Sequence, residues 1–393
     1  MTPAARVQAA IEIMDEVVLA AREGGAAADT LVARYFSTRR YAGAKDRRAV
    51  RELVYASIRR AGEAPGSGRA ALLGLVDDRP ELADAFDGSP HGPAAIVPAE
   101  PRADAGLAPA WLAQRLAQSL PPGELPALLD RAQLDLRINR LKDDGARTRA
   151  AFLDGHAGLL APDALRLPEG TQVERTEEYR AGLFEIQDEG SQLIALAAGA
   201  AAGMTAVDLC AGAGGKTLAL AAMMGGPAEG RLIACDVDRG RLSRLDPRAA
   251  RAGARIETRL LDGGREASQL ADLAALADVV LVDAPCSGTG TWRRNPEARW
   301  RLTPARIDRL VALQAHVLGL AAPLVRPGGA LVYAVCSLLA EEGADQAAGF
   351  LAGHPGWRAE ALEFGRAVGP GRLLTPAAHG TDGFFVARLV RPC

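Results

Sequence analysis

TAVDLCAGAGGKTLALAAMM, residues 205–224, is the stretch that decides the fold. An apolar run typical of a buried strand leads through a glycine-rich loop into a helix rich in alanine and leucine. Such a turn lets the main chain approach a nucleotide-like ligand closely. The loop departs from the GxGxxG fingerprint, because Thr217 replaces the third glycine, and from the GxxxxGK[ST] phosphate loop. The stretch predicts a ligand-binding α/β domain, with an ordinary tight turn as the alternative.

Strands and helices alternate from residue 186 onward, which is typical of an α/β domain. Helices are predicted over 216–224 and 304–325, and the last two strands are expected to form an antiparallel pair. The seven predicted strands are 205–210, 231–236, 255–262, 278–285, 330–337, 357–363 and 383–390.

An aspartate closes each of the first four strands: Asp208, Asp236, Asp262 and Asp283. An acid at the end of the second strand can accept hydrogen bonds from both ribose hydroxyls of a nucleoside. One at the end of the third can accept a bond from an adenine amino group. A single acid in such a place is commonly a helix cap or a surface residue, but four in register favour a nucleoside site.

Two further apolar runs each end in a cysteine followed by a small turn. Cys286 lies in VDAPCSG (282–288), and Cys336 lies in YAVCS (333–337). Ligands bind at the carboxyl ends of strands in a doubly wound sheet. Two thiols brought there by two strands indicate chemistry on a shared substrate. The alternative is that they are small buried hydrophobes, which is what we expect of the other three cysteines.

Composition narrows the class of protein. A chain of 393 residues with 49% hydrophobic content is long enough for two or three domains. It has no run of eighteen apolar residues and carries acids early, so neither a membrane span nor a signal peptide is expected. Five scattered cysteines and five histidines without metal spacing predict a reduced, metal-free, cytoplasmic protein. The net charge of −2 does not indicate nucleic-acid binding, but six arginines between 287 and 310 form a basic patch, either phosphate-binding or simply solvated.

We predict three parts along the chain. Residues 1–125 have helical periodicity, interrupted by a proline- and glycine-rich loop over 87–109. Residues 126–185 form a small mixed α+β connector that begins with a strand over 134–142. Residues 186–393 form the α/β domain.

The sequence resembles the RNA 5-methylcytosine methyltransferases, in particular the bacterial branch that acts on 16S ribosomal RNA. This resemblance implies a Rossmann-like, seven-stranded domain that uses S-adenosylmethionine. The N-terminal helices, with RYAGAKDRRAV (40–50), are similar to the all-α, RNA-binding domain of the NusB type. The loop has Gly212-Ala213 where the family usually has Ala-Pro, a difference that bears on cofactor affinity. The matching segments are QDEGSQL (187–193), DLCAGAGGKT (208–217), DVVLVDAPCSGTGTWRRNPEARW (278–300), ALVYAVCSLLAEEG (330–343) and DGFF (382–385).

The resemblance also implies roles for individual residues. Cys336 would be the nucleophile, Cys286 would assist release of the product, and Asp283 and Lys216 would line the cytosine pocket. The residues implied in binding the cofactor are Cys210, Ala211, Gly212, Ala213, Gly214, Gly215, Lys216, Asp236, Asp262 and Asp283. The residues implied in holding RNA phosphates are Arg293, Arg294, Arg299 and Arg301. No residue is assigned to a metal.

These residue types suit the chemistry. Carbon 5 of cytosine is a poor nucleophile until a thiolate adds to carbon 6. A nearby cation makes a cysteine thiolate available near neutral pH. Asp283 would hydrogen-bond or protonate ring nitrogen 3, and Cys286 would help remove the carbon 5 proton so that Cys336 can leave. The target base must lie outside a helical stack.

Three alternatives remain beside a monomeric 16S rRNA methyltransferase. The same chemistry on tRNA differs only in substrate, and the N-terminal helices favour rRNA. A non-catalytic RNA-binding factor of ribosome assembly would have no need of both thiols. A nicotinamide dehydrogenase is disfavoured by the glycine spacing.

Overall fold

The computed structural model describes residues 1–225 and 230–393, which form two compact units. One unit comprises Met1–Arg131 and Thr291–Thr303, and the other comprises Ala132–Gly290 and Pro304–Cys393. Residues 132–185 of the predicted connector (126–185) pack in the same unit as the α/β domain, whereas residues 126–131 belong to the N-terminal unit. Conversely, thirteen residues from the middle of the α/β sequence belong to the N-terminal unit.

The N-terminal unit is helical, as predicted. Its helices are α1 (Pro3–Glu23), α2 (Ala28–Ser37), α3 (Ala44–Arg60), α4 (Gly68–Asp78), a 3-10 helix (Pro80–Ala85) and α5 (Ala110–Ser119), followed by short 3-10 turns at Pro122–Glu124 and Pro126–Leu129. The Thr2 hydroxyl caps α1 by accepting a bond from Ala5 N, and the helix ends at Gly24 in the left-handed conformation. Apolar residues of α1, α2, α3 and α4 form one core.

The second unit is built on a nine-stranded sheet in the order β11-β12-β13-β9-β8-β5-β6-β7, with β10 also paired to β13. Strands β5 to β9 are parallel, and β13 is antiparallel to β9. All seven predicted strands are present, and the predicted antiparallel pair is β10 with β13. The strands are β5 (Thr205–Asp208), β6 (Arg231–Asp236), β7 (Glu257–Leu260), β8 (Ala277–Asp283), β9 (Val325–Val335), β10 (Arg358–Glu360), β11 (Arg366–Val368), β12 (Gly371–Leu374) and β13 (Phe384–Val390).

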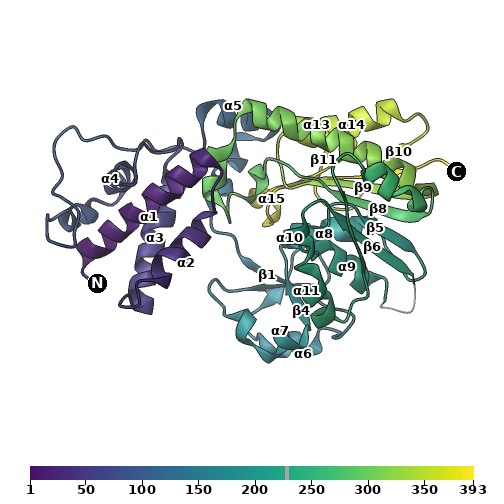
Figure 1. Ribbon diagram of the computed structural model, residues 1–393, viewed down its shortest axis with the longest axis horizontal. Helices are drawn as coiled ribbons and strands as arrows, with labels where there is room; N and C mark the ends of the chain where they lie inside the picture. The colour runs from purple at the N-terminus through teal and green to yellow at the C-terminus, as the bar shows by residue number, and fades with distance from the viewer. Residues whose placement is uncertain (226–229) are drawn as a thin grey trace. The chain divides into compact units, whose positions relative to one another are not determined.

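Helices cover both faces of this sheet, as expected where the central strands are apolar on both sides. Figure 1 shows α8 and α9 on one face, and α13 and α14 on the other. The first pair shares a core with the sheet through residues such as Ile194 and Leu220. The helices of the unit are α6 (Ala146–Ala151), α7 (Glu177–Ala181), α8 (Glu189–Ala198), α9 (Gly215–Met223), α10 (Arg239–Leu242), α11 (Leu245–Ala252), α12 (Glu266–Gln269), α13 (Pro304–Ala321), α14 (Ala344–Gly353) and α15 (Pro376–His379).

A second, four-stranded sheet in the order β2-β3-β1-β4 forms the region that we predicted as mixed α+β. Its strands are antiparallel where the register is defined. They are β1 (Leu134–Ile138), β2 (His156–Ala157), β3 (Ala164–Leu167) and β4 (Phe184–Ile186).

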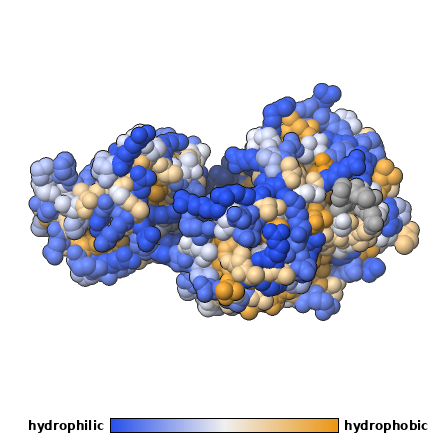
Figure 2. Space-filling model, turned by 90° about the horizontal axis from the view of Figure 1, so that it is seen from below, coloured by the Kyte–Doolittle hydropathy of each residue, from blue (hydrophilic) through white to orange (hydrophobic). Residues whose placement is uncertain are grey.

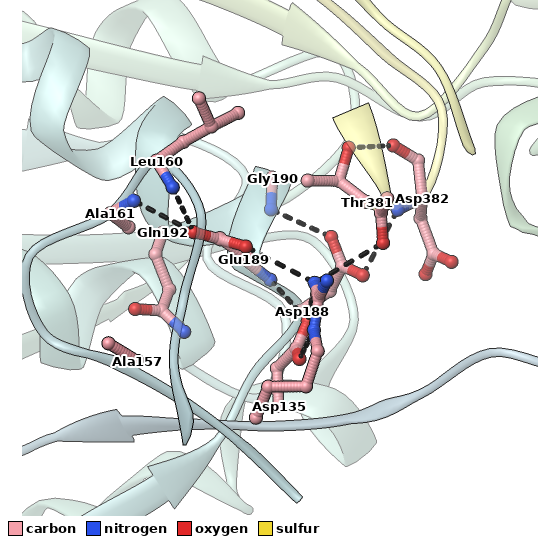
Figure 3. A network of polar contacts seen from close by, with 12 residues as sticks. Asp135, Ala157, Leu160, Ala161, Asp188, Glu189, Gly190, Gln192, Thr381 and Asp382 are labelled. Carbon is pink, nitrogen blue, oxygen red and sulfur yellow. Dashed lines mark hydrogen bonds and ion pairs between the residues drawn. The ribbon is translucent and has the colours of Figure 1, made fainter. Parts of the chain in front are cut away.

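A buried polar network joins the small sheet to the start of α8 (Figure 3). Arg166 of β3 bonds to Asp135 of β1 at 2.7 Å and to Glu189 of α8 at 3.2 Å. Glu189 also accepts bonds from the main-chain N–H groups of Leu160 and Ala161. Because buried charges are costly unless paired and hydrogen-bonded, this network fixes the start of α8 against the small sheet.

One helical stretch among the described residues, Pro304–Leu324, is long and apolar enough to cross a membrane. This is weak evidence, because a core helix of a soluble protein passes the same test. Here the helix packs against β8 and β9 and buries Ile307, Val317 and Leu318. Figure 2 shows a face on which hydrophilic side chains predominate and hydrophobic ones form small, interrupted patches.

Candidate active site

The order of the parallel strands reverses between β5 and β8, and the candidate site lies at their carboxyl ends. Such a switch point is where doubly wound sheets bind ligands, because the adjoining loops diverge to opposite faces. A cleft of about 900 Å³ opens there. It is lined by both Cys286 and Cys336, by Lys216 and Asp283, and by most of the glycine-rich loop.

The glycine-rich loop has the tight course that the sequence predicts. Gly212 and Gly214 adopt left-handed φ values of 55° and 84°. A Cβ at Gly214 would lie 2.1 Å from Leu245 Cδ1, so a side chain there requires Leu245 to shift in addition to the strained φ. Gly212 N donates to Asp236 Oδ2 at 2.7 Å, which ties the loop to the end of β6. The loop residues that line the cleft are Cys210, Ala211, Gly212, Ala213, Gly215 and Lys216.

Asp208 is buried beneath this loop at the end of β5. Its carboxylate accepts a bond from the Thr217 hydroxyl at 2.7 Å. The pKa of Asp208 is raised to about 7: burial is the largest cause, the Thr217 bond opposes the rise, and the negative charge of Asp283 adds to it. Asp208 is also one of the residues that line the cleft.

Asp236 and Asp262 have different positions. Asp236 is buried and lines the cleft, and its two oxygens accept bonds from Gly212 N and Asp238 N. Asp262 lies beyond the end of β7, is exposed, and pairs with Gln269 instead of lining the cleft. The structure therefore argues against an adenine contact by the Asp262 side chain. The neighbouring Leu261 lines the cleft in its place.

The two cysteines are brought together by neighbouring strands. Because β8 and β9 are paired in parallel, with Asp283 opposite Ala334, the loops after them start at one level. Cys286 Sγ and Cys336 Sγ lie 3.3 Å apart. Hydrogen bonding to Cys336 and burial both raise the pKa of the Cys286 thiol well above its usual value. Cys286 therefore stays protonated beside Cys336.

Lys216 and Asp283 form an ion pair in the same cleft, with Nζ and Oδ2 2.6 Å apart. Burial lowers the pKa of Lys216, but attraction to Asp283, the hydrogen bond to it and attraction to Cys336 together raise the pKa above the ordinary value. The lysine is therefore a fixed cation near Cys336. Of the Asp283 side chain, 30% is exposed.

The four arginines expected to bind phosphates belong to the helical unit and not to the unit that contains the cleft. All lie in the segment 291–303 of the helical unit. Arg299 is fully buried and donates to the main-chain oxygens of Ile58 and Ala61, at the end of α3. The prediction that Arg299 binds phosphate is therefore wrong, because its guanidinium is buried and donates its hydrogen bonds to main-chain oxygens.

The other three arginines of the set differ in exposure. Arg301 donates to the oxygens of Gly25 and Ala26, just after α1, at 2.8 and 2.7 Å. Arg293 is buried as well, which also argues against contact with RNA. Arg294 is half-buried, and a phosphate contact by this residue stays a prediction.

A buried carboxyl group that we assigned no role, Glu342, lies behind the two cysteines. It hydrogen-bonds to Ser287 and Ser337, which directly follow Cys286 and Cys336. The sequence offers one signal, since EEG (341–343) stands within a segment that resembles the family. The pattern alone does not show that Glu342 faces inward.

Comparison with known proteins assigns the chain to a family. Residues 196–390 match the family described as 16S rRNA methyltransferase RsmB/F. The chain is 34% identical over 313 residues to ribosomal RNA small subunit methyltransferase B of Sodalis glossinidius, covering 76% of this chain and 69% of the relative. The chain belongs to the RsmB/F family. It is thus a member of a family of S-adenosylmethionine-dependent RNA methyltransferases.

Two further matches agree. The chain is 34% identical over 299 residues to the probable ribosomal RNA small subunit methyltransferase B of Synechocystis, covering 72% of this chain and 66% of that relative. The crystal structure of PH0851 shares the fold, with a TM-score of 0.78 and 23% identity over 99% of both chains. The chain thus spans about two thirds of the length of the curated relatives that it matches.

Proposed function

We propose that this protein transfers a methyl group from S-adenosylmethionine to carbon 5 of a cytosine in 16S rRNA, through a covalent bond between Cys336 and the base. The observation that carries the proposal is the pair of thiols 3.3 Å apart in a cleft that also contains the Lys216–Asp283 ion pair. The curated relatives are named as small-subunit rRNA methyltransferases, which supports 16S rRNA as the substrate.

The residues present fit the cofactor. The open side of Gly212, where a Cβ would meet nothing within 4 Å, leaves the main chain accessible to a ligand. The Asp236 carboxylate is held on the cleft by Gly212 N and suits a ribose diol. The loop from Cys210 to Lys216 and Asp236 would hold S-adenosylmethionine, which supplies an electrophilic methyl group. Asp283 lines the same cleft.

Cys336 is assigned as the nucleophile because the groups around it favour its attack. The Lys216 ammonium supplies positive charge near the sulfur. The Cys286 thiol lies within hydrogen-bond reach of it and can donate to a thiolate. Attack on carbon 6 makes carbon 5 nucleophilic. A hydrogen bond between the Asp283 carboxyl group and ring nitrogen 3 would stabilise the negative charge that develops on the ring.

Cys286 is assigned to the final step, loss of the carbon 5 proton and departure of Cys336. The largest cause of its raised pKa is the hydrogen bond to Cys336. Once the sulfur of Cys336 is a thioether bonded to carbon 6, it is a poorer acceptor and cannot carry negative charge. The pKa of Cys286 then falls, so Cys286 can lose its proton to water and act as the base. Formation of the bond between Cys336 and carbon 6 thus prepares Cys286 for the elimination that later breaks this bond.

We further propose that the protein is cytoplasmic and monomeric. The helical unit, which resembles the NusB type in sequence, would bind rRNA outside the cleft. Arg294 and Arg301, both half-buried, remain candidates for a phosphate contact.

The test compares wild type with Cys336→Ala and Cys286→Ala, using labelled S-adenosylmethionine and three RNA substrates: naked 16S rRNA, assembled small subunits and tRNA. We expect label in cytosine of 16S rRNA with wild type and none with Cys336→Ala. Cys286→Ala should accumulate a protein–RNA adduct that survives denaturing electrophoresis.

Two outcomes would contradict the proposal. Label in tRNA alone would keep the chemistry and change the substrate. RNA binding without methyl transfer to any of the three substrates would favour a non-catalytic assembly factor.

A further inference from the structure

Glu342 is a fully buried acid at the end of the 3-10 helix Ala340–Glu342, outside the cleft lining. Its carboxyl group makes four hydrogen bonds. Oε1 accepts from Ser287 N at 2.8 Å and from Gln314 Nε2 at 3.0 Å. Oε2 accepts from the hydroxyl groups of Ser337, at 2.5 Å, and of Ser287. The carboxyl group is thus completely buried, and each of its two oxygens accepts two hydrogen bonds.

The partners of Glu342 are the residues next to the two thiols. Ser287 directly follows Cys286, and Ser337 directly follows Cys336. The two serine hydroxyls also lie 3.1 Å from each other. A single carboxyl group therefore joins the loop after β8 to the loop after β9 at the point where each loop carries its cysteine.

Other bonds attach this carboxyl group to the body of the unit. Gln314 of α13 bonds to Glu342 and also donates to Pro285 O at 2.9 Å. The buried Tyr333 hydroxyl of β9 donates to Glu342 O. Glu342 is consequently held from the helix layer and from the sheet, so it is a fixed point against which both loops are positioned.

We infer that Glu342 is the positioning residue for the two-cysteine site: it holds Cys286 and Cys336 at the separation that attack and release require. The inference rests on the proposed function for its catalytic meaning. The geometric claim, that Glu342 sets the distance between the sulfurs, stands apart from it. A misplacement of about 1 Å in a reacting group can reduce a rate about a hundredfold, so such a clamp has a measurable effect.

The pKa pattern agrees with this arrangement. Glu342 contributes to raising the pKa of Cys286, after the effects of Cys336 and of burial. A carboxyl group behind the pair thus favours the protonated form of the thiol that is assigned to release.

The test uses Glu342→Gln, which keeps the volume and removes one acceptor oxygen. The matched control is Glu341→Gln, the same change at the preceding, half-buried position. A second variant, Ser337→Ala, removes only the bond on the Cys336 side. For each protein, diamide is added, which takes up the two thiol hydrogens as the Cys286–Cys336 disulfide forms. Because the rate of that reaction also depends on thiolate content, it is divided by the rate at which iodoacetamide alkylates the same thiols, and the ratio reports the distance between the sulfurs without any methyl transfer.

We expect Glu342→Gln to slow disulfide formation at least tenfold and Ser337→Ala to slow it less. Covalent adduct formation on RNA containing 5-fluorocytosine, which cannot lose a proton from carbon 5, should fall about a hundredfold in Glu342→Gln. Binding of S-adenosylmethionine should stay within about twofold of wild type, because Glu342 does not line the cleft. Glu341→Gln should match wild type in each assay.

Wild-type rates of disulfide and adduct formation in folded Glu342→Gln would overturn the inference. Equal losses of cofactor binding and of disulfide rate would also overturn it, since they would indicate general loosening. If wild type methylates no RNA, the proposed function fails, and the diamide rates still decide whether Glu342 sets the distance between the sulfurs.

Discussion

The sulfur atoms of Cys286 and Cys336 lie 3.3 Å apart although fifty positions separate the residues in the chain. Parallel pairing of β8 with β9 accounts for this closeness, because the two strands end at one level of the sheet. The distance is within reach of an S–H···S hydrogen bond. The ionisation of the Cys286 thiol therefore depends on the state of Cys336.

Removal of Cys336 should lower the pKa of Cys286. The bond to Cys336 is the largest cause of the raised value, and burial remains in Cys336→Ala. We expect the alkylation rate of Cys286 by iodoacetamide, followed by peptide mass spectrometry, to rise at a lower pH in Cys336→Ala than in wild type. Cys393→Ala, which removes an exposed thiol, should leave the profile unchanged. An unchanged or higher pKa in Cys336→Ala would contradict the proposed use of Cys286 as a base.

Gly214 and Gly212 should respond differently to alanine. Both have positive φ, which costs a residue with a side chain about 1–2 kcal/mol. Only Gly214 also faces a clash, since its Cβ would lie 2.1 Å from Leu245 Cδ1, whereas nothing lies within 4 Å at Gly212. Overpacking should add about 1–3 kcal/mol to the cost of Gly214→Ala. Urea unfolding of both variants measures the difference, and equal losses would show that Leu245 moves aside freely.

The central sheet was predictable because its strands are continuous apolar runs bounded by turns. β6 begins and ends where the sequence indicates, at Arg231–Asp236. β11 (Arg366–Val368) and β12 (Gly371–Leu374) were not predicted. They are only three and four residues long, RAV and GRLL, which is too short for an alternating pattern to identify a strand. Their pairing with β13 comes from tertiary contact rather than from local pattern.

The residues that line the cleft were predictable where a sequence motif determines both the position of a side chain and the side of the sheet edge to which it points. Lys216, Asp283, Cys286 and Cys336 all line it. Asp262 does not, because β7 ends at Leu260 and the Asp262 carboxylate accepts a bond from Gln269 at the turn that follows. Arg299 does not either, and nothing in a run of arginines shows which of them enters a core. Glu342 was missed for the same reason, since burial of a charged side chain depends on partners distant in sequence.

The raised pKa of Asp208 should make stability depend on pH. The carboxyl group has a pKa of about 7 in the folded chain, against an ordinary value of 3.8. Between these values the folded state holds a proton that the unfolded state has lost, so stability falls as pH rises through about 7. We expect the free energy of unfolding, from urea titrations at pH 5 and pH 8, to fall less in Asp208→Asn than in wild type.

Thr217→Val provides the companion measurement. The Thr217 hydroxyl lowers the pKa of Asp208, so its removal should move the loss of stability to higher pH. If wild type and Asp208→Asn show the same pH dependence, Asp208 does not titrate in this range.

Arg299 should act on stability and not on RNA affinity. Its guanidinium, with 0% exposure, donates to the oxygens of Ile58 and Ala61 at the end of α3. Arg299→Met would leave the buried Ile58 oxygen without this donor, and the Ala61 oxygen with only the 3.3 Å bond from Trp300 Nε1, at a cost of about 1–3 kcal/mol. We expect a lower unfolding temperature and faster hydrogen exchange in α3. Arg309→Met, at an exposed site on α13, should stay within about 0.5 kcal/mol of wild type.

The salt dependence of RNA binding separates this structural role from a phosphate contact. Removal of one side chain that binds a phosphate reduces the slope of log affinity against log salt concentration by about one. A folded Arg299→Met protein should keep the wild-type slope, whereas Arg294→Met should reduce it if the half-buried Arg294 binds phosphate. A reduced slope in Arg299→Met at unchanged unfolding temperature would show that the guanidinium leaves the core to bind RNA, which its enclosed position makes unfavourable.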